Sequence, residues 1–129
     1  MKENKNTDEI LPANLNLYDL TDIKLLTNND DMLFVKLLNI LIEMFSSETK
    51  NIRSLAKDND WKAIAEIVHK LKTSLIHIQV NSLKQVVRDL EDYEDQNNEK
   101  LNLLKDEFCN ALDNIVIYLK VDLSAFTDV

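Results

Sequence analysis

The chain contains no glycine among its 129 residues and a single proline, Pro12. Hairpin turns and barrel corners depend on residues that accept positive φ angles or fix a turn, and glycine and proline are the main residues that do so. A strand-rich fold is therefore disfavoured. The sequence predicts an all-α protein whose helices are joined by longer polar connections.

Chain length, net charge and cysteine content narrow the possible domain organisation and binding partners. A chain of 129 residues is large enough for one hydrophobic core and one domain. Its net charge of −8 argues against nucleic acid or an anionic membrane as a partner, because both attract a basic face. Cys109 is the single cysteine, so neither an internal disulfide nor a cysteine zinc site can form.

Neither the N-terminus nor the most apolar stretch has the features of an export signal or a membrane span. The most apolar stretch, residues 33–45, is interrupted by polar and charged residues and is too short to cross a bilayer. The first eight residues are polar and lack the apolar core of a signal peptide. We therefore expect a cytoplasmic protein.

The segment from Ile64 to Ile78 has apolar residues at helical spacing and contains no helix breaker. With about 100° of rotation per residue, its apolar side chains share one broad face. That face comprises Ile64, Ile67, Val68, Leu71, Leu75 and Ile78. His69 lies roughly 150° from the centre of this face, so we expect its imidazole to point away from the core.

Similar apolar stripes predict three more substantial helices and a short one at the start. The short helix is expected over Leu15–Leu26, and the long ones from Leu33 to Ala56, from Trp61 to Ile78, from Leu83 to Tyr93, and from Leu101 to near Val121. Polar segments separate them, at residues 28–31, 57–60, 79–82 and 94–100. Asp60 is expected to cap the helix that carries His69.

Short connections make successive helices antiparallel neighbours. The expected architecture is therefore an antiparallel up-down-up-down four-helix bundle preceded by a short N-terminal helix. We expect the bundle domain at residues 15–121, with an N-terminal tail at residues 1–14 and a C-terminal tail at residues 122–129.

The outer face around His69 has features that suit chemistry with a partner protein. Lys72 lies one turn away on the same face, and the small residues Ala65 and Thr73 lie one turn to either side. A neutral imidazole is a nucleophile near physiological pH. A lone histidine on a surface helix is more often simply a solvated polar residue. The neighbouring residues, and not His69 alone, therefore indicate a functional site.

Those surroundings resemble a known family. The run Val68-His69-Lys70-Leu71-Lys72-Thr73 follows an Asp60-Trp61 helix start, and Leu90-Glu91 ends the neighbouring helix. The chain resembles the histidine-containing phosphotransfer (HPt) domains of bacterial and eukaryotic phosphorelays, over about residues 17 to 120. The resemblance implies a helical bundle in which His69 accepts a phosphoryl group.

The resemblance also implies roles for neighbouring residues. Lys72 would stabilise the phosphoryl charge, and Glu91 would orient the imidazole. Ala65, Thr73 and Ile76 would belong to the face that docks a receiver domain. Thr73 departs from the family, which usually has glycine after the lysine, and its branched side chain would narrow the approach to His69.

The implied partners are receiver domains of response regulators or a hybrid sensor histidine kinase, with His69 passing the phosphoryl group between receiver aspartates. The chain offers no nucleotide loop or catalytic carboxylate pair, so we expect a monomeric phosphotransfer protein rather than an enzyme with its own turnover. It is expected to need no cofactor of its own, the magnesium ion belonging to the receiver.

Three other functions compete with phosphoryl transfer for a sequence of this kind. A bundle of this kind could bind a receiver or kinase as a scaffold or inhibitor without transferring phosphate, or could be a structural bundle with an unrelated partner. Glu66 and His69 also match half of a di-iron site, but such sites need two Glu-x-x-His motifs that point inward. Ser74 precedes His77 at the corresponding offset, so no metal site is expected.

Overall fold

The computed structural model describes residues 17–127 of the chain. This part contains five α-helices, two 3-10 helices and no strand. They are α2 (Thr21–Leu26), α3 (Asp31–Lys57), α4 (Trp61–His77), η2 (Asn81–Leu83), α5 (Lys84–Glu91), η3 (Tyr93–Asp95) and α6 (Asn98–Thr127). The predicted all-α class is confirmed, and the predicted N-terminal tail lies outside the described residues.

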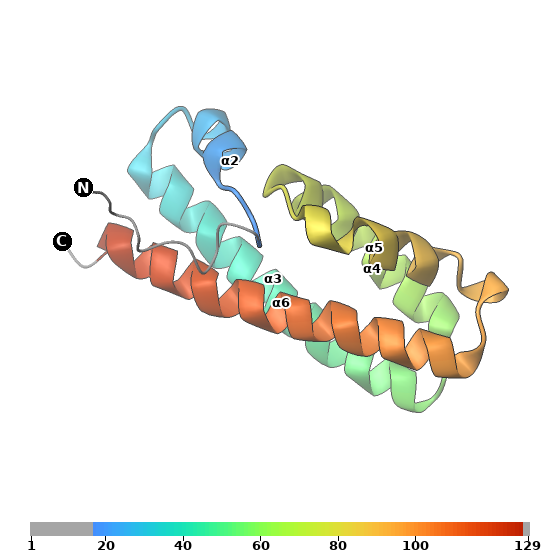
Figure 1. Ribbon diagram of the computed structural model, residues 1–129. Coiled ribbons are helices and arrows are strands. Elements are labelled where there is room, and N and C mark those ends of the chain that lie inside the picture. The colour runs from blue at the N-terminus through green and yellow to red at the C-terminus, as the bar shows by residue number, and fades with distance from the viewer. Residues whose placement is uncertain (1–16, 128–129) are drawn as a thin grey trace, which may run out of the picture.

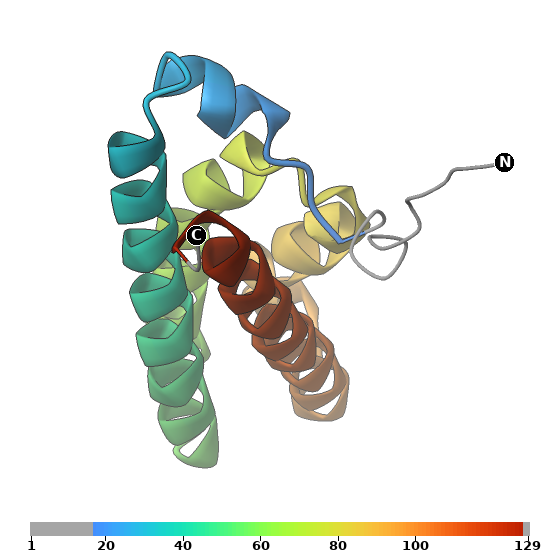
Figure 2. The same cartoon turned by 90° about the vertical axis from the view of Figure 1, so that its left-hand side faces the viewer.

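The two longest helices, α3 and α6, lie side by side and form one half of a helical bundle (Figure 1). The other half is the pair α4 and α5, and the short α2 lies across the end of the bundle beside the α4–α5 turn (Figure 2). One continuous hydrophobic core fills the space between the helices. Its largest fully buried side chains include Phe34, Phe45, Leu71, Phe108 and Leu112.

Side-chain caps explain where the two helices before the site begin. The carboxylate of Asp30 accepts a hydrogen bond from the backbone N–H of Leu33, and that of Asp60 accepts one from Ala63. Trp61, the first residue of α4, is buried and donates its indole N–H to the side-chain oxygen of Asn98 at 2.6 Å. Both ends of this contact are helix starts, so it fixes α4 against α6.

The turns show how a chain without glycine reverses direction. Among residues 17–127, four adopt positive φ angles: Asn28 (54°), Asn29 (59°), Asn59 (55°) and Gln79 (54°). Asparagine tolerates this left-handed region better than other residues with a Cβ atom, but glutamine has no such preference. Gln79, which ends the turn after the His69 helix, is therefore held in a costly backbone conformation by the packing around it.

The first predicted helix boundary needs correction. Residues 17–20 are not helical, and α2 begins only at Thr21, whose backbone N–H donates to the Asp19 carboxylate at 2.8 Å. The backbone N–H of Asp19 donates to the carbonyl of Ile78 at 2.8 Å. This bond ties residues 17–20 to the end of α4, so these residues do not continue α2 towards the N-terminus.

The predicted end of the last helix near Val121 is wrong, because α6 continues to Thr127. Two contacts hold the extra turns in place. The ring of Phe126 packs against Phe34 with centroids 4.8 Å apart, and Tyr18 donates a hydrogen bond to Asp122. Because these partners are distant in sequence, the stripe on α6 alone did not reveal them.

The fourth helix is shorter than predicted. Residues 81–83 form the 3-10 helix η2, α5 ends at Glu91, and Tyr93 belongs to the separate 3-10 helix η3. The predicted polar turn at residues 94–100 also ends early, because α6 starts at Asn98. The side chain of Asn97 accepts a hydrogen bond from the backbone N–H of Lys100 at 2.7 Å and so caps α6.

Candidate functional site

His69 lies near the middle of α4, and its side chain is 72% exposed. The predicted outward orientation is confirmed. The neighbours Val68 and Leu71 on the opposite side of the helix are fully buried, and they fix the rotation of α4 about its axis. A rigid, core-packed helix therefore presents an accessible imidazole to solvent.

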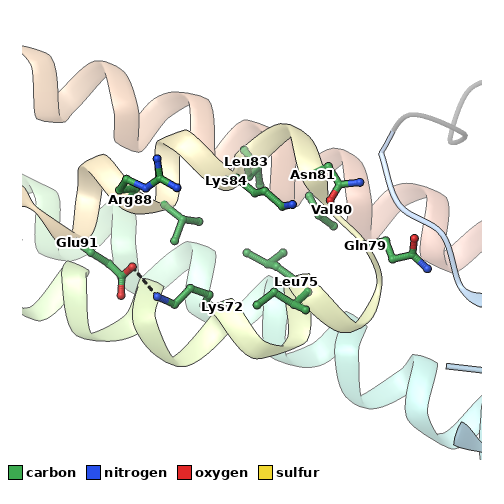
Figure 3. A pocket seen from close by; sticks show the side chains of 11 residues that line it. Lys72, Leu75, Gln79, Val80, Asn81, Leu83, Lys84, Arg88 and Glu91 are labelled. Carbon is green, nitrogen blue, oxygen red and sulfur yellow. Dashed lines mark hydrogen bonds and ion pairs between the residues drawn. The ribbon is translucent and has the colours of Figure 1, made fainter. Parts of the chain in front are cut away.

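Glu91, the last residue of α5, lies across from His69 and connects the two helices. One of its carboxylate oxygens lies 2.6 Å from Nδ1 of His69, and the other accepts a hydrogen bond from Nζ of Lys72 at 2.9 Å. The three side chains that the sequence singled out from α4 and α5 thus form one cluster. Figure 3 shows the Lys72–Glu91 bond from the side of the groove between these helices.

The electrostatics of this cluster favour an ionised Glu91. Partial burial opposes its charge, but the hydrogen bonds from Lys72 and His69 outweigh burial and hold the pKa of Glu91 below its ordinary value. An ionised carboxylate accepts hydrogen bonds and donates none. When His69 is neutral, its proton therefore resides on Nδ1, and the lone pair on Nε2 is free to face a partner.

Lys72 is positioned for an incoming anion. Its side chain is 40% exposed, and its ammonium group is held at the cluster by Glu91. An ammonium next to the nucleophile can neutralise developing charge on phosphoryl oxygens. The cluster therefore combines a nucleophile, a group that orients it and a cation within two helices.

The three residues expected to form the docking face differ in their exposure to solvent. Thr73 and Ile76 are exposed on α4, with Ile76 at 61%. Ala65 is buried at 9% exposure, because it lies close to the core side of the helix, and it adds little to a docking surface. The accessible part of this face therefore extends from His69 towards Ile76.

Sequence reasoning missed one charged neighbour of the site. Glu48 is buried on α3, and its carboxylate lies 2.5 Å from Nζ of Lys70, the residue after His69. The hydrogen bond from Lys70, aided by one from Asn51, lowers the pKa of Glu48 against the effect of burial. Glu48 lies between Phe45 and Ile52 at helical spacing. This position within the apolar stripe of the helix could have identified Glu48 from the sequence as a buried carboxylate.

Three further features of the described residues concern metal ions, membranes and the single cysteine. Within residues 17–127 no three His, Cys, Asp or Glu side chains gather closely enough to hold a metal ion. Over the same range no helix has the length and apolar character that crossing a membrane requires. Cys109 is fully buried, and burial raises its pKa to about 11, so its thiol is neutral and shielded.

The described residues form a helical bundle with an exposed histidine that is held by a carboxylate and lies near a lysine. The family model described as Hpt domain matches residues 36–118, which is more than half of the chain. The protein therefore belongs to the Hpt domain family, whose members are phosphotransfer modules of two-component signalling rather than catalysts in the usual sense. Searches of curated proteins and of solved structures found no match.

Proposed function

We propose that this protein is a phosphorelay intermediate in which His69 takes a phosphoryl group from a receiver-domain aspartate and passes it to another receiver. The observation that carries this proposal is the bond between Nδ1 of His69 and Glu91 at 2.6 Å on an otherwise exposed imidazole. In the neutral imidazole, this bond places the proton on Nδ1 and leaves the lone pair of Nε2 available to a partner.

The transfer step follows from that arrangement. Nε2 of His69 attacks the phosphorus of the aspartyl phosphate, an N–P bond forms, and the bond between phosphorus and the aspartate oxygen breaks. The receiver aspartate leaves as a carboxylate, and the positive charge that develops on the imidazole is balanced by Glu91. Lys72 binds the phosphoryl oxygens. Transfer to the next receiver reverses these bonds.

The receiver is proposed to dock over His69, Thr73 and Ile76. Support comes from exposed apolar side chains at the same end of the bundle, on α2 and the start of α3. They are Leu25, Leu26, Met32 and Leu33. The bond from Asp19 to Ile78 holds the segment before α2 against the end of α4, which is the end that carries Ile76.

The remaining features of the proposal concern the state of the protein. We propose an antiparallel up-down-up-down order for α3 to α6, supported by the short connections at residues 58–60 and 78–80. A cytoplasmic monomer fits a chain whose apolar stripes are buried in its own core. Magnesium would be held by the receiver, and no transfer step here is assigned to it.

The competing possibility is a module that binds a receiver without accepting phosphate, and Thr73 is the residue that raises it. Replacing Thr73 by glycine tests whether its branched side chain obstructs the approach to His69. Faster transfer in Thr73→Gly than in wild type would locate the obstacle there. Stable receiver binding with no label on His69 in either protein would establish the non-transferring module instead.

A further inference from the structure

A groove of about 500 Å³ lies between α4 and α5, next to the phosphoacceptor cluster (Figure 3). This volume falls within the range of small-molecule sites in proteins. The groove extends from the α4–α5 turn, at Gln79 to Asn81, to Glu91 at the end of α5. Because an α-helix rises by about 1.5 Å per residue, α5 alone accounts for about 11 Å of this length.

The floor of the groove near the α4–α5 turn is apolar, although polar Gln79 and Asn81 also line this end. Leu75, Val80 and Leu83 line it and are buried in the core. Ile76 lies on the rim and is exposed. An apolar ligand segment in this part would cover hydrophobic surface without displacing any protein hydrogen bond.

Positive charge lines the middle of the groove and its Glu91 end, with Lys84 beside Leu83 at the start of α5 and Arg88 one turn further towards Glu91 (Figure 3). Lys72, Lys84 and Arg88 line the groove, and Glu91 is the carboxylate among its lining residues. Lys72 already donates to Glu91, whereas Lys84 has no ion-pair partner within residues 17–127. The guanidinium of Arg88 donates to the neutral side-chain oxygen of Gln85 at 3.3 Å. Three cations against one carboxylate form a positive site on a protein whose net charge is −8.

In Figure 3, Arg88 and Glu91 lie at one end of the groove, Val80 and Asn81 lie towards the other, and Lys84 lies beside Leu83 between them. We propose that this groove binds an amphipathic monoanion, an acid with an unbranched apolar chain such as a medium-chain carboxylate. The carboxylate binds Arg88 and Lys84, and the chain lies over Leu83 and Val80. The groove shares Lys72, Ile76 and Glu91 with the acceptor cluster and the proposed docking face, but binding of the acid does not require phosphorylation of His69.

Decanoate, below its micelle concentration, is the probe for this site. Titration into the full-length protein, followed by amide chemical shifts, should move resonances of residues 72–91 and leave the outer faces of α3 and α6 unchanged. Octanoate should bind about tenfold more weakly, because it lacks two methylenes. Decanol, which has a similar chain without the charge, should bind at least tenfold more weakly than decanoate.

Variants test the assignment of the charged end. Arg88→Gln should weaken decanoate binding about tenfold and Lys84→Gln about threefold, whereas Lys62→Gln, at an exposed lysine earlier on α4, should leave it unchanged. The absence of saturable shifts in the wild-type protein would overturn the proposal. Equal binding of decanol and decanoate, or equal effects of Lys84→Gln and Lys62→Gln, would overturn the assignment of the cationic end. None of these results depends on phosphorylation of His69.

Discussion

Replacing Glu91 by glutamine removes the negative charge next to His69 while keeping the size of the side chain. The amide can place either its oxygen or its NH₂ group towards Nδ1, so the proton on Nδ1 is no longer enforced. The variant also loses the charge that balances the imidazolium formed during transfer. Both changes raise the barrier to attack by Nε2.

The magnitude follows from the exposure of the cluster. A hydrogen bond to a charged group contributes about 1.5–3 kcal/mol when it is shielded from water. His69 is 72% exposed and Glu91 is 21% exposed, so solvent screens part of this contribution and about 1 kcal/mol remains. We therefore expect Glu91→Gln to slow transfer about fivefold. Freeing Lys72 from Glu91 would speed transfer, because more of its charge would be available to the phosphoryl oxygens. This gain is small, because the amide oxygen of the glutamine can still accept a hydrogen bond from Lys72.

The assay is single-turnover transfer from a phosphorylated receiver domain to the purified protein, followed by gel separation. Glu94→Gln is the matched control, because Glu94 is exposed in η3 beyond the cluster. It should transfer at the wild-type rate. Nitrogen chemical shifts of the His69 ring should show the Nδ1–H tautomer in wild type and a mixture in Glu91→Gln. Transfer by Glu91→Gln at the wild-type rate or faster would refute the orienting role of Glu91.

Three further changes have defined outcomes. Lys72→Gln should slow transfer about tenfold in the same assay by removing the cation from the phosphoryl oxygens, while Lys62→Gln should have no effect. Gln79→Gly should stabilise the protein by about 1 kcal/mol in denaturant unfolding because glycine relieves the left-handed conformation, whereas Gln85→Gly inside α5 should destabilise it by about the same amount. The lowered pKa of Glu48 means that its stabilisation is complete above the unfolded pKa of about 4.3 and is lost as the pH falls through the folded value, so Glu48→Gln should flatten the acid limb of the stability curve. Equal signs for the two glycine variants, or an unchanged acid limb, would contradict these assignments.

Much of this structure could be predicted from local pattern. The stripe of α4 placed Val68 and Leu71 in the core and His69 outside, and Asp60 was identifiable as a cap, because both depend on neighbours within a few residues. The meeting of His69 with Glu91 could be proposed only through the family resemblance. It depends on how α4 and α5 pack, which periodicity does not determine.

The remaining features arise from contacts between distant segments. The extension of α6 depends on Phe126 meeting Phe34, and the late start of α2 depends on Asp19 bonding to Ile78. The groove beside Lys84 and Arg88 lies between two helices, and the space between helices is not encoded in the stripe of either one. Local pattern predicts the helices and their faces, whereas tertiary contacts set their ends and the surfaces between them.

The most direct test of phosphoryl acceptance compares wild type with His69→Gln, using phosphorylated receiver domains from the same genome as donors. We predict label on the wild-type protein alone, stable in base and lost in acid, as expected for a phosphorus bond to an imidazole nitrogen. His69 is exposed on a helix held by its opposite face, so the substitution leaves the core intact. Equal labelling of both proteins, or no labelling of wild type by any receiver that binds it, would contradict the assignment of His69 as the phosphoacceptor.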